Sequence, residues 1–232
     1  MDSSLSSSDQ SPGETLPPIP GDWGAETVTI AGRTFELILP GKPEAFLDDP
    51  EVIAANRLDD YMPYWATLWP GARTMAGLLK QAPWAAGVEL LELGAGIGLV
   101  GLVAQSLGHP VVYSDYDPVA VQVCRRNALR NGLADPEVLV LDWRTPPARS
   151  FAAILGCEVT YDPKLHEALL NTIESMLQPG GVCWLGDPGR YWSRQFHELA
   201  SRRFCVKVMN DQLRECSFPS NREFQIFELR KG

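Results

Sequence analysis

The stretch Val88-Glu-Leu-Leu-Glu-Leu-Gly-Ala-Gly-Ile-Gly-Leu-Val-Gly101 decides the fold. Its mostly apolar run from Val88 to Leu93 stops at glycines, which predicts a buried parallel strand that ends in a tight turn. The residues from Leu99 to Leu107 then predict a helix. Glycines let a backbone approach closely and a helix N-terminus presents unpaired N–H groups, so this unit favours a nucleotide-like ligand.

Two glycine patterns overlap in this turn, and they predict different ligands. Gly96-x-Gly98-x-x-Gly101 satisfies the dinucleotide fingerprint, but its glycines begin two residues late relative to the end of the strand. Gly94-x-Gly96-x-Gly98, preceded by Glu92, instead resembles the first motif of class I methyltransferases, which use S-adenosyl-L-methionine. A glycine pattern by itself is not specific, so the rest of the chain has to decide.

Length and composition exclude several classes of function. The 232 residues, 45% of them hydrophobic, suit one α/β domain with an appendage. A net charge of −9 argues against a nucleic-acid partner that is held by phosphate neutralisation. The five cysteines are odd in number and contain no C-x-x-C pair, and His109, His166 and His197 lie far apart. We therefore expect neither a disulfide framework nor a metal site.

The location of the protein is predicted from what its segments lack. No apolar run approaches the roughly 20 residues that a membrane-spanning helix needs. The first residues have neither basic side chains nor an apolar core, so they do not predict a signal peptide. We expect a cytoplasmic monomer without a membrane partner.

The composition changes along the chain predict three parts. Residues 1–20 are rich in Ser, Pro and Asp and predict a disordered tail, with a phosphorylated or partner-binding tail as the alternative. In residues 21–60, the alternating segments Glu26–Ile30 and Thr34–Leu39 predict a β-hairpin, which short helical pieces and loop follow. Residues 61–232 form the main domain.

Strands and helices alternate through the main domain. Such alternation predicts a parallel sheet with helices on both faces, whose ligands bind beyond the carboxyl ends of the strands. The expected strands are residues 88–93, 110–114, 137–141, 151–155, 181–185, 204–209 and 224–229.

Two aspartates follow the second of these strands. Asp115 lies 21 positions after Gly94, close to the offset of about 20 residues at which a carboxylate accepts hydrogen bonds from ribose hydroxyls. Asp117 precedes Pro118 and predicts the cap of the next helix. We assign Asp115 to ribose, and a role only as a helix cap is the alternative.

Asp142 and Trp143 come at the end of the third strand. The carboxylate offers an acceptor for an adenine amino group, and the indole offers a flat face for the adenine ring. Both NAD and S-adenosyl-L-methionine contain adenosine, so this pair does not separate the two ligands. A loop aspartate beside a packing tryptophan is the alternative.

Several motifs follow one another in the main domain. They are Tyr64–Gly71, Leu91–Gly101, Ser114–Pro118, Arg126–Gly132 and Asp142-Trp143. In this order they resemble the motifs of the seven-β-strand protein methyltransferases, over roughly residue 60 to the C-terminus. Glu158-Val-Thr-Tyr161-Asp and Gly186-Asp-Pro-Gly-Arg190 are most similar to the branch that methylates lysines of the electron transfer flavoprotein β-subunit.

The resemblance implies a fold and a cofactor. The fold is a Rossmann-like, doubly wound α/β sheet of seven strands whose last strand is antiparallel, with the hairpin ahead of it. The cofactor is S-adenosyl-L-methionine, and Trp65 and Trp69 wall its pocket, with core packing as their alternative. The expected cofactor-binding residues are Trp65, Trp69, Glu92, Gly94, Gly96, Gly98, Asp115, Asp142 and Trp143.

The resemblance also implies a catalytic pair, Glu158 and Tyr161, for which a cap before the next helix is the alternative. We expect Glu158 to orient an incoming ammonium or accept a hydrogen bond, because a carboxylate favours the charged amine and is a poor base. The family typically carries Asp-x-x-Tyr here, so Glu158 moves the carboxylate outward by one methylene. Asp187 and Arg190 are expected to contact the substrate.

The implied activity is that of a protein-lysine N-methyltransferase. A lysine ε-amine attacks the methyl carbon of the sulfonium in line and S-adenosylhomocysteine leaves, without a metal or a covalent intermediate. The implied protein substrate is the electron transfer flavoprotein β-subunit. The alternatives are a methyltransferase of small molecules or other protein residues, an NAD(P)-dependent oxidoreductase, and a non-catalytic module that binds adenosylmethionine.

Overall fold

The computed structural model describes residues 15–220 and 222–232. The tail predicted over residues 1–20 therefore falls largely outside the described residues. Of its last residues, Leu16 and Ile19 pack against the hydrophobic core, and the Pro17 carbonyl accepts a hydrogen bond from Trp23 Nε1 at 2.8 Å.

The N-terminal hairpin forms as predicted from its alternating pattern. Strands β1 (Trp23–Ile30) and β2 (Arg33–Pro40) pair antiparallel along their whole length. Ala31 and Gly32 connect them with positive φ angles of 52° and 83°. In the first half of β2 alternate residues turn inward, so that Phe35 and Leu37 are fully buried while Glu36 is exposed; Ile38, after them, is also buried.

The main sheet has its strands where the apolar runs predict them. The strands are β3 (Leu90–Leu93), β4 (Val111–Asp115), β5 (Glu137–Val140), β6 (Phe151–Cys157), β7 (Leu177–Asp187), β8 (Cys205–Asn210), β9 (Glu215–Cys216) and β10 (Gln225–Arg230).

Their order in the sheet is β5-β4-β3-β6-β7-β10-β8-β9. Strands β3 to β7 pair parallel, whereas β10 runs antiparallel to both β7 and β8. This confirms the Rossmann-like fold with an antiparallel last strand. Among the described residues the sheet has one strand more than the seven expected, because the short β9 extends the edge beside β8.

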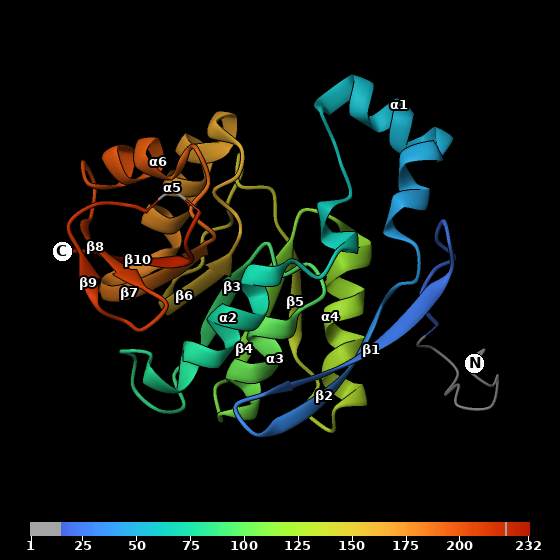
Figure 1. Ribbon diagram of the computed structural model, residues 1–232, viewed down its shortest axis with the longest axis horizontal. Coiled ribbons are helices and arrows are strands. Elements are labelled where there is room, and N and C mark those ends of the chain that lie inside the picture. The colour runs from blue at the N-terminus through green and yellow to red at the C-terminus, as the bar shows by residue number, and fades with distance from the viewer. Residues whose placement is uncertain (1–14, 221) are drawn as a thin grey trace.

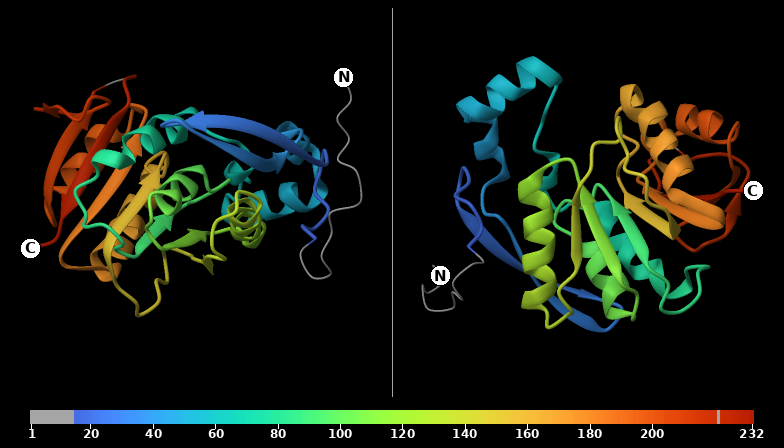
Figure 2. Two further views of the ribbon diagram at one scale, coloured as in Figure 1. Left: turned by 90° about the horizontal axis from the view of Figure 1, so that it is seen from below. Right: turned by 180° about the vertical axis from the view of Figure 1, so that it is seen from behind.

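Helices cover both faces of the sheet (Figures 1 and 2). On one face, side chains such as Leu90 and Tyr113 pack with α2, α3, α4 and the hairpin, and on the other face Leu91 and Leu93 pack with α5 and α6. Adjacent residues of β3 therefore serve opposite faces, as the period of a strand requires. The helices are α2 (Pro70–Leu78), α3 (Leu99–Ser106), α4 (Pro118–Arg130), α5 (His166–Met176) and α6 (Ser193–Ala200).

Two asparagines of the α4 region hold the hairpin in place. Asn127 Oδ1 accepts from Ile38 N at 2.7 Å, and its Nδ2 donates to Ile38 O and to Ile97 O, both at 3.0 Å. One turn later, Asn131 makes the same pair of bonds with the backbone of Glu36, at 2.9 and 2.8 Å. Strand β2 therefore packs against α4, and in Figure 1 the hairpin crosses the lower part of that helix.

Between the hairpin and the main domain, the chain forms the short helix η1 (Pro43–Asp48) and the helix α1 (Pro50–Asp59). Asp49 caps α1 by accepting hydrogen bonds from Glu51 N and Val52 N. None of the residues of α1 is buried, and the helix stands off the body in Figure 1. Within the described residues, every helix is too short or too polar to cross a membrane.

Candidate functional site

In the turn after β3, the glycines with backbone angles that favour glycine are those of only one of the two overlapping patterns. Gly94, Gly96 and Gly98 all have positive φ angles, of 61°, 55° and 84°. A Cβ atom at Gly94 would also lie 2.7 Å from Val159 Cγ1. Side chains other than glycine rarely adopt such angles, so the backbone geometry follows the Gly94-x-Gly96-x-Gly98 pattern.

Glu92 lies beneath this turn. It is 2% exposed, and its Oε2 accepts a hydrogen bond from Gly101 N at 3.1 Å. A Cβ atom at Gly101 would lie 2.3 Å from that oxygen and 2.4 Å from Tyr113 Cε1. Burial raises the pKa of Glu92 to about 8. The side chain predicted to bind the cofactor thus supports the start of α3 from inside the fold.

Asp115 and Asp117 take different positions after β4. Asp115 is a partly exposed residue, and its carboxylate accepts hydrogen bonds from Gly96 N at 2.9 Å and Asp117 N at 3.1 Å. Burial raises the pKa of Asp115 to about 6. Asp117 caps α4 by accepting from Val119 N at 2.7 Å, which confirms the predicted cap, and it also accepts from the Tyr61 hydroxyl. Asp115 is therefore the aspartate that stands beside the glycine turn, and its role toward ribose stays a prediction.

Asp142 belongs to an ion-pair network. Both of its carboxylate oxygens lie 2.9 Å from Arg144 Nε, and Arg144 reaches on to Asp59 at the end of α1, with Nη1 2.9 Å from Oδ1. Hydrogen bonding from Arg144 lowers the pKa of Asp142 below its usual value. An adenine amino group would share this carboxylate with Arg144. Trp143 lies nearby, with Cζ2 3.7 Å from the place of a Cβ atom on Gly94.

The two tryptophans predicted to wall the cofactor pocket have separate environments. Trp65 is 6% exposed, and its ring packs against Trp23 and Phe46, with centroids 6.2 and 5.6 Å away. The Trp65 ring thus packs in the core, which was the alternative to a role in the cofactor pocket. Only the backbone of Trp65 lies beside Gly96. Trp69 is partly exposed and faces the Arg190 guanidinium, with Cζ 5.6 Å from its ring centroid.

Glu158 is buried, and its two carboxylate oxygens have different partners. Oε1 accepts from Gly71 N at 2.7 Å, an otherwise unpaired donor in the first turn of α2. Oε2 forms an ion pair with Arg190 Nη2 at 2.5 Å. The residue has a positive φ of 58°, a strained angle for a side chain other than glycine. Its carboxylate does not cap the next helix, where Asp162 accepts from Lys164 N.

Three aromatic side chains pack together next to the Glu158–Arg190 pair, because the Tyr64 ring contacts both Tyr161 and Trp69 and the Trp69 ring faces Arg190. The Tyr64 and Tyr161 rings meet edge to face at 5.0 Å between centroids, and the Tyr64 carbonyl accepts from Trp69 Nε1 at 2.8 Å. Burial raises the pKa of Tyr161 to about 12, so its hydroxyl remains protonated near neutral pH. We call Tyr64, Trp69, Glu158, Tyr161 and Arg190 the Glu158 cluster.

Asp187 was expected to contact substrate, but it is fully buried. Its Oδ1 accepts from Gly189 N at 2.7 Å, from Ser193 Oγ at 2.6 Å and from Arg190 N at 3.1 Å. These bonds close the loop after β7 around the aspartate. Asp187 therefore fixes the backbone from which Arg190 projects, and that geometry is typical of a positioning residue.

Several residues of the site were not predicted from the sequence. Tyr61 and Tyr64 come from the aromatic stretch, Arg144 comes from the loop after β5, and Gly71 follows Pro70. A Cβ atom at Gly71 would lie 2.6 Å from Glu158 Oε1. The Trp-Pro-Gly sequence could have indicated Gly71. A glycine early in a helix lowers helix stability, so its presence suggests that another group approaches the backbone closely there.

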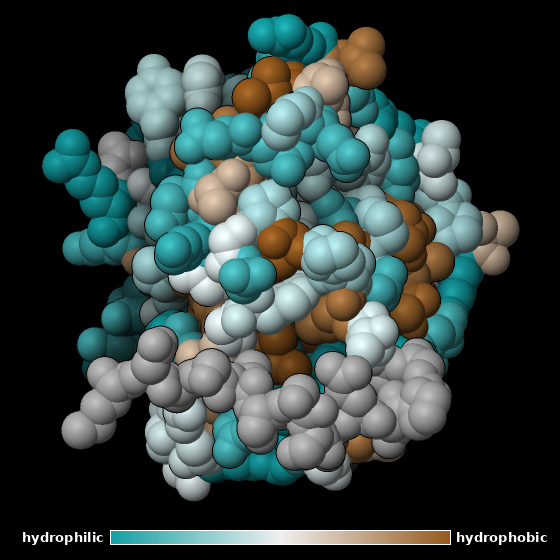
Figure 3. All heavy atoms as spheres, turned by 90° about the vertical axis from the view of Figure 1, so that its right-hand side faces the viewer, coloured by the Kyte–Doolittle hydropathy of each residue, from teal (hydrophilic) through white to brown (hydrophobic). Residues whose placement is uncertain are grey.

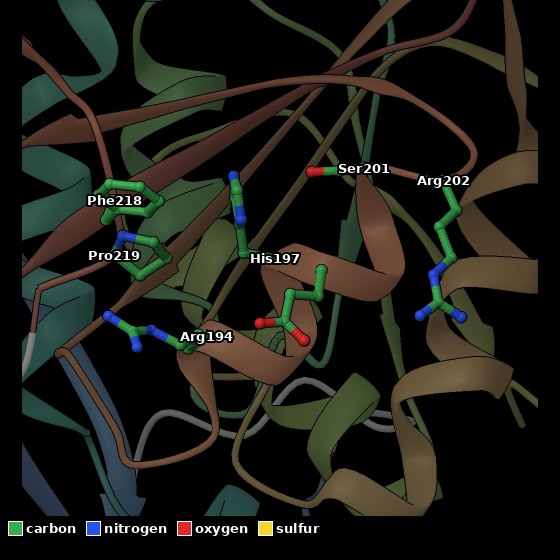
Figure 4. A pocket seen from close by; sticks show the side chains of 7 residues that line it. Arg194, His197, Ser201, Arg202, Phe218 and Pro219 are labelled. Atoms are coloured by element: carbon green, nitrogen blue, oxygen red, sulfur yellow. The ribbon is translucent and has the colours of Figure 1, made fainter.

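A separate hollow lies between α6 and the loop before β10 (Figure 4). Phe218 and Pro219 face Arg194 and His197 across it, while Arg202 points away from them. None of the predicted site residues lines this hollow. Within the part of the chain that the structure describes, no group of His, Cys, Asp and Glu side chains has the arrangement of a metal site.

Known proteins resemble this chain at the level of sequence. A family model described as "Lysine methyltransferase" matches residues 66–198. The "Histone-arginine methyltransferase METTL23" of Mus musculus is 30% identical over 162 residues, which cover 63% of this chain and 59% of that protein. The "Protein N-lysine methyltransferase METTL21A" of Danio rerio is 26% identical, over 85% of this chain and 94% of that protein. The match thus spans less than two thirds of the METTL23 relative.

Solved structures share the fold. The 16S rRNA N2 G1207 methyltransferase RsmC of T. thermophilus, in complex with AdoMet and guanosine, superposes with a TM-score of 0.61 at 19% identity. That match covers 93% of this chain and 52% of RsmC. A TehB-like SAM-dependent methyltransferase from Corynebacterium glutamicum gives a TM-score of 0.56 at 20% identity, over 78% of this chain and 97% of that one.

Proposed function

Because the chain belongs to the lysine methyltransferase family, we propose that it transfers methyl groups from S-adenosyl-L-methionine to the ε-amine of a lysine in a protein. One contact carries this proposal. Val159, the residue after Glu158, has its Cγ1 2.7 Å from the place of a Cβ atom on Gly94, so the segment that carries Glu158 and Tyr161 adjoins the glycine turn. A cofactor on the turn and an amine beside Glu158 would be neighbours.

The residues at the turn fit S-adenosyl-L-methionine. Three glycines with positive φ leave three positions of the turn without side chains, and the Asp115 carboxylate, which accepts a hydrogen bond from Gly96 N, suits ribose hydroxyls. When bound, the cofactor supplies an electrophilic methyl group on a sulfonium sulfur. The protein's own contribution is to hold an acceptor amine in line with that methyl group.

The Glu158 cluster has the chemistry to receive a lysine. An ammonium must lose its proton before it has a lone pair for attack, and a lone carboxylate nearby would oppose that loss. Arg190 already pairs with Glu158, at 2.5 Å, and compensates its charge. Glu158 can then orient the amine without holding it in the charged form, and the packed rings of Tyr64, Trp69 and Tyr161 offer aromatic surface to the lysine stem.

Arginine is a second candidate acceptor, and one observation favours it. Glu158 and Trp69 together already hold a guanidinium, that of Arg190. A substrate arginine could make the same ion pair and the same ring contact if Arg190 moved aside.

The test uses methyl-labelled S-adenosyl-L-methionine, a cell extract and the purified protein, with Asp115→Ala as the control. We expect label in protein bands that the control does not produce, and methyl-lysine in their acid hydrolysate. Methyl-arginine would favour the second candidate. Label confined to small molecules, or cofactor binding without any transfer, would refute the proposed function.

The acceptor protein is a separate question. The electron transfer flavoprotein β-subunit stays the prediction from the sequence resemblance, and it can be tested directly as purified protein. We expect its lysines to be labelled in preference to those of an unrelated basic protein, and equal labelling of both would remove it as the specific acceptor.

A further inference from the structure

The segment Pro43–Asp60, which comprises η1 and α1 and which we call the arm, exposes apolar side chains. Leu47 is 58% exposed, Ile53 38% and Leu58 88%. In Figure 3, hydrophobic side chains reach the surface at the top of the molecule, over these helices, among hydrophilic neighbours. Exposed apolar residues that gather on one element are typical of a surface that binds a partner.

The arm is also acidic. Its residues 43–60 hold six acidic side chains and one basic side chain, that of Arg57. Asp49 caps α1, and Asp59 and Asp60 form ion pairs with Arg144 and Lys164. The structure shows no ion pair for Glu44, Asp48 or Glu51 within its described residues. In the sequence these three carboxylates flank Leu47 and precede Ile53, so acidic and exposed apolar side chains share the same segment.

The arm contacts segments that lie next to the Glu158 cluster. Asp59 contacts Arg144 after β5, and Lys164 Nζ lies 2.7 Å from Asp60 Oδ2 in the segment that follows Tyr161. The chain then continues from Asp60 into Tyr61, which binds Asp117, and into Tyr64, which meets Tyr161. The arm therefore stands at the edge of the proposed acceptor site.

We propose that the arm docks a basic segment of the protein acceptor that also carries apolar residues. This inference rests on the proposed function, because the acceptor of a lysine methyltransferase presents lysine. Charge complementarity favours this occupant, since Glu44, Asp48 and Glu51 attract lysine and arginine while Leu47, Ile53 and Leu58 bury apolar side chains. A nucleic acid or a second copy of the arm would bring like charges together.

The experiment measures binding without methyl transfer. The probe is a fluorescein-labelled peptide of repeated Lys-Ala-Ala-Leu units, compared with its Glu-Ala-Ala-Leu counterpart by fluorescence anisotropy. The first variant combines Glu44→Gln, Asp48→Asn and Glu51→Gln, and the second combines Leu47→Ser, Ile53→Ser and Leu58→Ser. The matched control removes three acidic charges elsewhere, by Glu198→Gln, Asp211→Asn and Glu215→Gln. Circular dichroism checks that each variant folds.

We expect the basic peptide to bind the wild-type protein, with an affinity that falls as salt is added. Each arm variant should weaken binding by about tenfold, and the control should leave it unchanged. With a protein acceptor, the arm variants should raise KM and leave kcat and the affinity for S-adenosyl-L-methionine unchanged.

Equal binding by the arm variants and the wild-type protein would overturn the proposal, as would stronger binding of the acidic peptide. A wild-type dimer that the apolar variant converts to a monomer, in analytical ultracentrifugation, would instead assign the surface to a second copy. If the peptide binds as expected but no protein is ever labelled, the docking surface stands and the proposed function fails.

Discussion

The glycine turn and the Glu158 cluster adjoin each other, yet they are built in different ways. The turn is made by consecutive residues, and Asp115 is held in place by backbone N–H groups, including that of Gly96. The cluster gathers side chains from residues 64–71, 158–161 and 187–190, and Glu158 is separated from Gly71 by 87 positions. Local sequence thus fixes the cofactor half, whereas the acceptor half depends on the whole fold.

The largest effect is expected beneath the glycine turn. Gly101→Ala places a methyl group 2.3 Å from Glu92 Oε2 and 2.4 Å from Tyr113 Cε1, both in the core. We expect the free energy of unfolding in urea to fall by about 3 kcal/mol. Gly77→Ala in α2 is the matched control, because nothing lies within 4 Å of its new methyl group, and it should stabilise by about 0.5–1 kcal/mol. If the two substitutions changed the free energy of unfolding to a similar extent, close packing against Gly101 would not be what stabilises the region beneath the glycine turn.

The Glu158 cluster should respond in turnover rather than in cofactor affinity. Glu158→Gln keeps the shape of the side chain but weakens its interaction with an amine and with Arg190. We expect kcat to fall by roughly 100-fold, with the affinity for S-adenosyl-L-methionine within about twofold of wild type by calorimetry. Glu167→Gln breaks an Arg–Glu pair outside the site, with Arg203, and should leave both quantities unchanged. A matching loss of cofactor affinity would mean that the two halves are not separable.

Asp115 should give the opposite pattern. In Asp115→Asn the carboxylate that we assign to the ribose hydroxyls becomes an amide, so we expect affinity for S-adenosyl-L-methionine to fall by about 30-fold. Asp135→Asn is the control, since this exposed aspartate pairs only with Arg125 in the described structure. Unchanged affinity in Asp115→Asn would remove Asp115 from cofactor binding.

A smaller effect is expected from pH. Burial raises the pKa of Asp115 from 3.8 to about 6, so the carboxyl takes up a proton as the pH falls through that value. Cofactor affinity should drop by about tenfold between about pH 7 and pH 5, because a neutral carboxyl is a weaker acceptor. The same proton stabilises the folded chain, and this stabilisation is complete below about pH 4 and lost as the pH rises through about 6.

Affinity and stability should therefore change in opposite directions over this range of pH. Asp115→Asn should remove both changes, which titration calorimetry and urea unfolding at each pH would detect. If both changes persist in the variant, another group is responsible for them.

The difference between the two halves also explains which predictions the sequence supports. The strand, the glycine turn, Asp115 and the cap at Asp117 follow from local patterns, and the structure has these elements at those residues. Local patterns do not show whether a side chain is free. The Trp65 ring lies in the core, the Asp187 carboxylate accepts hydrogen bonds from the loop that follows it, and Asp142 pairs with Arg144. Each of these outcomes depends on packing or on partners outside the motif.

The asparagines that hold the hairpin have a consequence for self-association. An isolated two-stranded hairpin leaves backbone groups open along its edges, and such edges recruit strands of other chains. Along β2, the backbone N–H and C=O groups of Glu36 and Ile38 are bound by the amides of Asn131 and Asn127. A helix therefore occupies the place where a third strand would add, and this edge is closed to the strand-by-strand growth that leads to aggregates.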